Sequence, residues 1–273
     1  MNIEAQFKLT DQVALVTGGG GVLGSAMAHA VAQAGATVVV MGRTLAKLET
    51  VANEIVAAGG KAYPIAADVI SRESLEAAKT EILAKSGRVD ILINGAGGNH
   101  PSATTNPNLS LFDLPEDAMR FVFDLNCLGT ILPSQIFGAV MAKQQTGVII
   151  NISSMAAYKP LTRVPMYAAA KSAITNFTFW LASHMALEYS PNIRVNAIAP
   201  GFFVGEQNRR LLLNEDGSLT PRGQSIIDHT PMNRFGDPED LGGTTVWLAS
   251  AAAKFVTGIV VPVDGGYSAF GGV

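Results

Sequence analysis

Cysteine is nearly absent from this sequence, with Cys127 the only one among 273 residues. A single cysteine excludes an intramolecular disulfide and a cysteine-based metal cluster. Charge is also sparse, at 15% of residues, and 19 basic against 22 acidic side chains give a formal net charge of −3. Such a balance provides no basic footprint of the kind that binds nucleic acid or an anionic membrane surface, so neither partner is expected.

A basic leader and long apolar runs are missing as well. Residues 1–6 contain no basic patch followed by an apolar core, so we expect no signal peptide. No stretch of about 18 residues is apolar without interruption, which argues against a membrane span. We therefore expect a cytoplasmic protein. No grouping of His, Asp and Glu has the spacing of zinc ligands, so a catalytic metal is not expected either.

Apolar residues, at 48%, and 28 glycines predict a densely packed interior. No repeat or linker divides residues 1–273, and this length suits one α/β domain. Seven short β-branched runs alternate with Ala-rich helical stretches, which predicts a parallel seven-stranded sheet covered on both faces, the Rossmann-type doubly wound fold. The expected strands are 13–17, 37–41, 61–66, 89–94, 148–153, 194–199 and 258–263, and the expected helices lie near 22–35, 44–59, 71–86, 115–145, 165–190 and 238–252.

Two connections, 97–115 and 201–237, are long for a compact domain. Loops of this length are usually functional and often act as lids. Because a doubly wound sheet binds its ligands outside the carboxyl ends of the strands, we expect both segments to contact a substrate there.

A glycine-rich segment, Thr17–Gly24 (TGGGGVLG), lies between the first expected strand and the first helix. Glycines allow the backbone to approach a dinucleotide pyrophosphate closely, and they leave free N–H groups at the helix N-terminus. In this position the pattern predicts a dinucleotide site. Its expected contacts are Gly18, Gly20, Gly21, Val22 and Leu23.

The ends of the next two strands carry residues that could distinguish cofactors. The second strand ends in Met41-Gly42-Arg43-Thr44, without the acid that would bind the ribose hydroxyls. Arg43 slightly favours NADP(H) over NAD(H), although a solvated arginine at a helix start is equally compatible. Asp68, which ends the third strand, could accept a hydrogen bond from the adenine amino group or cap the following helix.

Tyr167 and Lys171 are four residues apart on an expected helix and therefore share one face. Reducing a ketone creates an alkoxide that needs a proton from a positioned acid, and a nearby ammonium lowers the pKa of a phenol. Ser154 follows an expected strand at the ligand-binding edge, where its hydroxyl could polarise a carbonyl. Either feature alone is common in helices and turns, but together they predict a hydride-transfer site.

The glycine turn, Asn94-Gly95-Ala96-Gly97, the spacing of the serine, tyrosine and lysine, Pro200-Gly201 and VDGG at 263–266 together resemble the short-chain dehydrogenase/reductase family over essentially the whole chain. The resemblance implies that Tyr167 is the acid/base, that Lys171 lowers its pKa and binds the nicotinamide ribose, and that Ser154 orients the substrate. Asn126 looks like the helix-kinking asparagine that holds a relay water near the lysine.

Further cofactor contacts and an assembly follow from the same resemblance. Val22, Gly95 and Gly205 depart from the usual residues of the family pattern. The resemblance also implies a homotetramer in which the closing strand, 258–263, and the last helices pair between subunits. Besides Tyr167, Lys171 and the glycine turn, the expected cofactor contacts are Arg43, Asp68, Val69, Asn94, Ala96, Gly97, Pro200, Gly201 and Phe203.

A narrower resemblance concerns the loops 94–101, 200–209, 214–222 and 230–232, which look like the D-mannonate oxidoreductase (fructuronate reductase) branch. It implies reversible reduction of D-fructuronate to D-mannonate. Such a substrate needs several hydrogen-bonding groups and a cation for its carboxylate. The candidate substrate residues are Asn99, His100, Ser154, Arg163, Gln207, Asn208 and Arg209.

Other functions fit parts of the same pattern. One is a short-chain reductase of another keto sugar acid, of the gluconate 5-dehydrogenase type, or of a 3-oxoacyl thioester. A different class is a dinucleotide-binding sensor without turnover, because a fold alone does not prove activity. A sensor predicts loss of a polar catalytic residue, whereas Asn126, Ser154, Tyr167 and Lys171 are all present.

Overall fold

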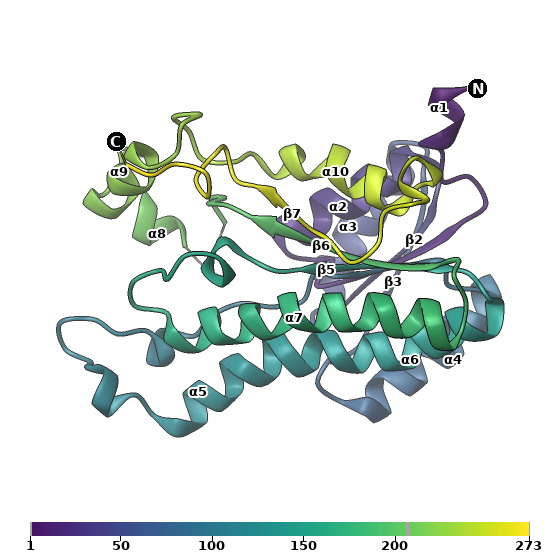
Figure 1. Cartoon of the computed structure of the whole chain (residues 1–273), viewed down its shortest axis with the longest axis horizontal. Helices are drawn as coiled ribbons and strands as arrows, with labels where there is room; N and C mark the ends of the chain where they lie inside the picture. The colour runs from purple at the N-terminus through teal and green to yellow at the C-terminus, as the bar shows by residue number, and fades with distance from the viewer. Residues whose placement is uncertain (1, 206–207, 273) are drawn as a thin grey trace.

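Seven parallel strands form one sheet in the computed structural model, which describes residues 2–205 and 208–272 (Figure 1). The sequence predicted all seven strands and their parallel arrangement, and the structure confirms both. The strands are β1 (Val13–Thr17), β2 (Thr37–Gly42), β3 (Lys61–Ala66), β4 (Ile91–Asn94), β5 (Gly147–Ile152), β6 (Ile193–Pro200) and β7 (Val260–Val263). The main helices are α2 (Val22–Gln33), α3 (Leu45–Ala57), α4 (Arg72–Ser86), α5 (Glu116–Phe123), α6 (Gly129–Gln144), α7 (Pro165–Glu188) and α10 (Gly242–Ala249), and a short α1 (Ile3–Gln6) precedes β1.

The strand order is β3-β2-β1-β4-β5-β6-β7. After β1 the chain moves outward in one direction through β2 and β3, and it then returns to add β4 on the other side of β1. This reversal makes the carboxyl ends of β1 and β4 a topological switch point, where α/β sheets open a crevice for ligands. Thr17 is paired with Asn94, and Asn94 with Asn151, so polar residues of three adjacent strands end at this edge.

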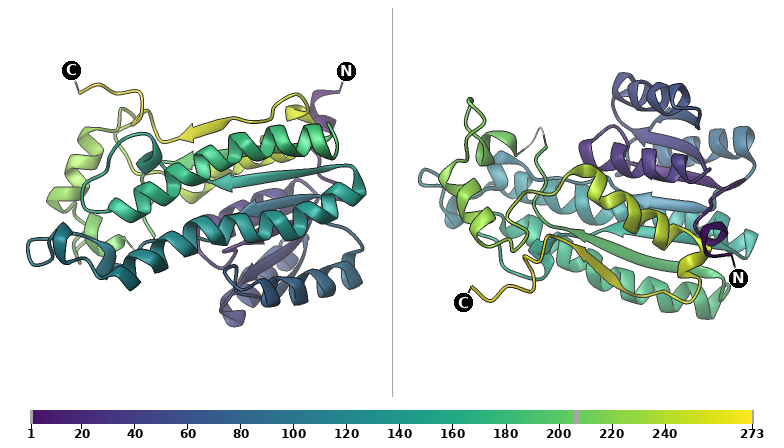
Figure 2. Two further views of the ribbon diagram at one scale, coloured as in Figure 1. Left: turned by 60° about the horizontal axis from the view of Figure 1, so that its bottom comes forward. Right: turned by 90° about the horizontal axis from the view of Figure 1, so that it is seen from above.

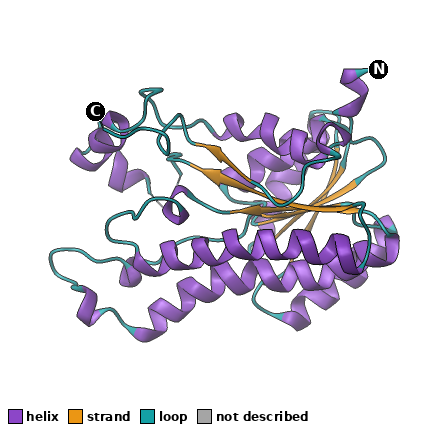
Figure 3. Cartoon of the chain, viewed as in Figure 1, coloured by secondary structure: helices purple, strands orange, loops and turns teal. Residues whose placement is uncertain are grey.

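Helices cover both faces of the sheet, as Figures 1 and 3 show. On one face α2, α3 and α10 pack over Val16, Val40 and Ile150. On the other, α4, α6 and α7 pack over Leu15, Leu92 and Ile149. Buried strands that are apolar on both faces explain why their sequence shows continuous β-branched runs instead of alternation.

One helix is longer than the rest because α5 and α6 are joined by a π-helical segment, η3 (Asp124–Leu128). The resulting helix, Glu116–Gln144, is long and apolar enough to cross a membrane by length and composition. Over its most apolar window, 56% is buried inside the fold, where α5 contacts α7 and α6 contacts α4. Core packing therefore accounts for its apolar character.

The two long connections contain short helices that the sequence pattern did not predict. Segment 97–115 includes η1 (Pro101–Ala103) and η2 (Leu111–Asp113), and segment 201–237 includes α8 (Arg209–Leu212) and α9 (Pro221–Asp228). Thr220 caps α9 by accepting a hydrogen bond from the backbone N–H of Gly223 at 3.0 Å. In Figure 2 these segments lie at the end of the molecule toward which the strand arrows point. The expected substrate loops thus lie at the ligand-binding edge.

Candidate active site

In the glycine turn between β1 and α2, backbone atoms approach one another too closely for side chains. Gly18 has a φ of +66°, and a Cβ added there would lie 2.8 Å from the backbone of Ala96. A Cβ on Gly24 would lie only 2.2 Å from the carbonyl oxygen of Gly18. Gly21 is the N-cap of α2 and provides no side-chain cap. The first N–H groups of α2 therefore have no side-chain cap, which fits a dinucleotide pyrophosphate bound at this helix end.

The residues expected around the adenosine lie beside this turn. Arg43 is exposed just beyond β2. Asp68 follows β3, and its carboxylate accepts a hydrogen bond from the N–H of Ile70 at 3.1 Å. Val69 is buried. The N–H of Ala96 donates to the Thr17 hydroxyl at 3.1 Å, which fixes the segment after β4 against the glycine turn.

Asn94, an expected cofactor contact, also belongs to a buried polar chain, and its Oδ1 has no partner in the described chain. Its amide donates to the Ser134 hydroxyl and to Asn151 Oδ1, both at 2.9 Å. The Asn151 amide donates in turn to Thr178 at 2.9 Å. This chain joins β4, β5, α6 and α7 behind the ligand edge. The sequence reasoning missed Ser134, Asn151 and Thr178, although an asparagine ending an apolar strand was a usable signal.

Lys171 extends from α7 to the end of β5. Its buried ammonium donates to the carbonyl oxygen of Ile152 at 2.7 Å and lies 5.6 Å from the centre of the Tyr167 ring. The Ser154 hydroxyl contacts the Tyr167 phenol and opposes the rise in its pKa. Ser154 also accepts a hydrogen bond from the N–H of Ala156 at 3.1 Å, which holds it at the strand end. Serine, tyrosine and lysine therefore converge, as the sequence predicted.

Burial dominates the acid–base properties of this group. Desolvation raises the pKa of Tyr167 above its ordinary value, and the Ser154 hydroxyl offsets only part of the rise. The direction of this shift is opposite to the lowered pKa that the sequence led us to expect, because burial removes solvent from the phenol. Desolvation also lowers the pKa of Lys171 to about 8. At neutral pH the phenol is protonated and the lysine carries its charge.

Asn126 lies in the π-helical segment, fully buried. Its side chain donates to the carbonyl oxygen of Gly98 at 2.6 Å and accepts from the N–H of Gly98 at 3.1 Å. A Cβ on Gly97 would lie 2.7 Å from Asn126 Oδ1 and 3.2 Å from the Lys171 ammonium. The asparagine therefore fixes the start of segment 97–115 against the lysine. Only glycine leaves enough room there.

The residues expected near the nicotinamide lie at the carboxyl end of β6. Pro200 ends that strand, and the N–H of Gly201 donates to the carbonyl oxygen of Val263 at 2.9 Å. Phe203 is buried, and its ring packs so tightly on Gly236 that a Cβ there would lie 2.4 Å from it. Phe203 can therefore face a cofactor only through its backbone.

The candidate substrate residues are spread over three loops. Asn99 donates to the Thr104 hydroxyl at 2.8 Å, while its buried Oδ1 has no partner in the described chain. His100 caps η1 by accepting from the N–H of Ser102 at 3.2 Å. Arg163 is exposed four residues before Tyr167.

The remaining candidates lie after β6. The Asn208 amide closes its own loop, with contacts of 2.8 Å to the N–H of Gly205 and to the carbonyl oxygen of Phe203. Arg209 is exposed at the start of α8, and Gln207 lies outside the described residues. Among the residues with described positions, no group of three or more His, Cys, Asp or Glu side chains could hold a metal ion.

Comparison with known proteins identifies the family of this chain. A model of the short chain dehydrogenase family matches residues 12–215. The uncharacterized oxidoreductase UxuB of Bacillus subtilis (strain 168) is 52% identical, over 97% of this chain and 98% of its own length.

Solved structures agree with this likeness. A protein of Haemophilus influenza, proposed to be a D-mannonate oxidoreductase and solved with bound NAD, superimposes with a TM-score of 0.92 at 42% identity over the whole of both chains. A gluconate 5-dehydrogenase of Burkholderia cenocepacia, in complex with NADP and tartrate, gives a TM-score of 0.89 at 30% identity, over 98% of this chain and all of the other.

Replacing Lys171 with methionine tests the burial of its ammonium. The folded lysine has a pKa of about 8, whereas in the unfolded chain it stays protonated up to about pH 10.4. Between these values the unfolded state binds more protons, so the stability of the native protein rises with pH. We expect the wild type to gain about 2 to 3 kcal/mol relative to Lys171→Met between pH 7 and pH 10, measured by urea unfolding.

The matched control is Lys143→Met, because Lys143 is exposed on α6 and solvated in both states. This variant should follow the wild type at every pH. A constant difference between wild type and Lys171→Met across the range would contradict burial of a charged lysine.

Proposed function

Since this chain belongs to the short-chain dehydrogenase/reductase family, it is an oxidoreductase that uses a nicotinamide dinucleotide, and we propose that it interconverts D-fructuronate and D-mannonate. The convergence of Ser154, Tyr167 and Lys171 beside the glycine turn carries the catalytic part of this proposal. Similarity along the full length to a proposed D-mannonate oxidoreductase supports the substrate. We place the reaction in the cytoplasm.

The roles of the residues follow from their contacts. A bound nicotinamide supplies or accepts the hydride. The Ser154 hydroxyl holds the substrate oxygen, and Tyr167 donates a proton to it as negative charge develops during reduction. A raised tyrosine pKa suits this task, because the phenol is protonated at neutral pH. The Lys171 ammonium, held by Ile152, lies beside the ring and stabilises the phenolate that remains.

Segment 97–115 and α5 together contact the tyrosine of this group. Tyr167 packs against the small apolar cluster of Ala103, Ala118 and Val122. The unpartnered Oδ1 of Asn99 is an acceptor for a sugar hydroxyl, since a buried polar atom without a partner is costly. A polyhydroxy acid satisfies such an atom, whereas an acyl chain does not.

A second candidate is another keto sugar acid, such as 5-ketogluconate. Similarity to the gluconate 5-dehydrogenase of Burkholderia cenocepacia favours it. The sequence identity to that protein, 30%, is lower than the 42% to the proposed D-mannonate oxidoreductase. Both candidates use the same tyrosine and serine. Both carry the ketone on the fifth carbon counted from the carboxylate, and they differ in the configuration of the hydroxyl beside the carboxylate.

Assays with D-fructuronate, 5-ketogluconate and an acetoacetyl thioester test the substrate. We expect the highest kcat/KM with D-fructuronate. Tyr167→Phe should lower kcat by about 100-fold or more, with a much smaller effect on cofactor affinity, because the proton donor is lost while the ring remains. Tyr189→Phe, at the exposed end of α7, should retain wild-type rates. Lack of activity on every sugar acid would reject the substrate, and an active Tyr167→Phe would reject the mechanism.

We further propose that the enzyme prefers NADP(H), because Arg43 follows β2 where an acid would otherwise bind the ribose hydroxyls. Arg43→Gln should lower kcat/KM for NADPH about tenfold, through loss of a charged contact to the 2′-phosphate, and leave kcat/KM for NADH unchanged. Steady-state kinetics with both cofactors measure this ratio. Equal losses with NADPH and NADH, or a wild type that prefers NADH, would exclude the role of Arg43.

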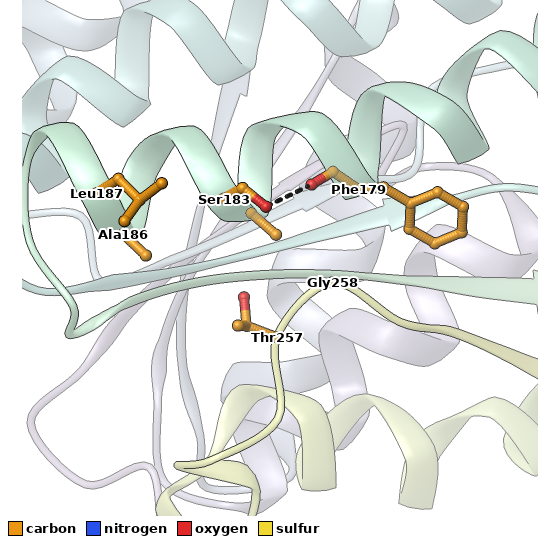
Figure 4. Close-up of a pocket in the computed structure, with 7 residues that line it drawn as sticks. Phe179, Ser183, Ala186, Leu187, Thr257 and Gly258 are labelled. Carbon is orange, nitrogen blue, oxygen red and sulfur yellow. Dashed lines mark hydrogen bonds between the residues drawn. The ribbon is translucent and has the colours of Figure 1, made fainter.

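A homotetramer is the assembly that we propose, with the edge strand β7 and the outer face of α7 in a subunit contact. Leu187 is 82% exposed, Trp180 55% and Phe255 100%, an unusually apolar surface. A groove runs between α7 and the turn before β7, as Figure 4 shows. Its lining residues are Phe179, Ala182, Ser183, Ala186, Leu187, Thr257 and Gly258.

Leu187→Glu tests this surface by placing a charge in the contact. We expect a smaller assembly than the wild type by light scattering, because an unpaired carboxylate is costly to bury. Leu211→Glu is the control, since Leu211 is also exposed but lies on α8. A monomeric wild type, or an unchanged mass of Leu187→Glu, would disprove the contact.

A further inference from the structure

Arg163 adopts an unusual backbone conformation at the entrance of the site. Its φ is +74°, in the left-handed region that a side chain as large as arginine rarely occupies. Its carbonyl oxygen accepts a hydrogen bond from the N–H of Thr105 at 2.9 Å, which joins the loop before α7 to segment 97–115. Arg163 is thereby fixed just before the first turn of α7, which carries Tyr167. Strained residues of this kind cluster at ligand sites.

A second arginine reaches the same place from α9. The Arg222 guanidinium contacts the Thr162 hydroxyl at 3.4 Å, one residue before Arg163. Arg222 follows the N-terminal Pro221 of α9. The helix itself is held by Gly223, where a Cβ would lie 2.2 Å from the carbonyl oxygen of Leu212. The sequence reasoning missed Arg222, which is far from Tyr167 along the chain.

The two guanidinium groups repel each other. Burial and the charge of Arg163 both lower the pKa of Arg222 below its ordinary value. The first turn of a helix adds the positive end of its dipole, which also disfavours a cation. In the described parts of the chain neither arginine forms an ion pair with an acidic side chain. Three unfavourable effects thus coincide, Tyr267 opposes them only in part, and the charge of a bound anion would offset them.

Two charged groups of the neighbouring segments form hydrogen bonds with the backbone. The Lys159 ammonium donates to the carbonyl oxygens of Tyr267 and Phe270, at 3.2 and 2.9 Å. Asp264 accepts hydrogen bonds from the N–H groups of Gly266 and Ser268, at 3.0 and 2.7 Å. In the described chain Asp264 forms no ion pair with either arginine.

We propose that Arg163 and Arg222 together bind the carboxylate of the substrate and make the enzyme selective for acids over neutral sugars. The inference rests on the proposed function and adds Arg222 as a specificity-determining residue. Guanidinium groups suit this task because each presents parallel N–H donors to the two oxygens of a carboxylate. Arg163 immediately precedes the helix turn that carries Tyr167, so in this proposal a six-carbon acid held by its carboxylate extends its ketone toward the phenol.

Arg222→Gln tests the pair, with Arg210→Gln as its matched control. Arg210 is an exposed arginine of α8, in the same segment, and its replacement removes the same charge. For the keto acid that the wild type reduces, Arg222→Gln should raise KM roughly 10- to 100-fold with little change in kcat, because a uniform binding contact is lost. KM for the neutral ketohexose D-fructose and for the cofactor should not change, and Arg210→Gln should match the wild type.

Calorimetric titration of tartrate into the wild-type complex with NADP provides a readout that does not depend on turnover. We expect binding by the wild type and by Arg210→Gln, weakened at least about tenfold in Arg222→Gln. If no sugar acid is a substrate, the proposed function fails, while this titration still decides the arginine pair. Absence of tartrate binding by the wild type, or equal weakening in both variants, would overturn the pair.

Discussion

The hydrogen bond from the Lys171 ammonium to the carbonyl oxygen of Ile152 is the contact on which the site depends. It joins α7 to the end of β5, so the helix that carries the tyrosine and the strand that precedes Ser154 are held in one geometry. Burying an ammonium is costly, and a single carbonyl recovers only part of that cost. Buried charges with a shifted pKa, such as this ammonium, are typical of functional sites.

The sheet supports that contact from behind. Asn94 and Asn151 end adjacent strands, and their amides link β4 and β5 to α6 and α7. Buried amides are strongly directional, because a small shift leaves a donor without its acceptor. The polar chain therefore fixes the relative position of strands and helices more tightly than apolar packing alone would. The positions of Ser154, which follows β5, and Lys171, on α7, are fixed in the same way.

Much of this architecture follows from local sequence patterns. All seven strands, the glycine turn and the tyrosine–lysine pair were predictable, because β-branched runs, glycine at a strand end and i, i+4 spacing are local signals. The direction of the Tyr167 pKa was not predictable, since it depends on how much solvent the fold removes. The short helices α8 and α9 escaped prediction because they are brief and stabilised by contacts with each other. Arg222 escaped for a related reason: only the folded chain brings α9 to the loop before α7.

The loops around the entrance are tied to one another, through Thr105 to Arg163 and through Thr162 to Arg222. Both ties lie outside the buried polar chain of Asn94, Asn151 and Thr178. Exchanging exposed loop residues can therefore alter which molecules are admitted while that chain is kept. Such a division of labour allows one scaffold to diversify its substrates in evolution while its chemistry is inherited intact.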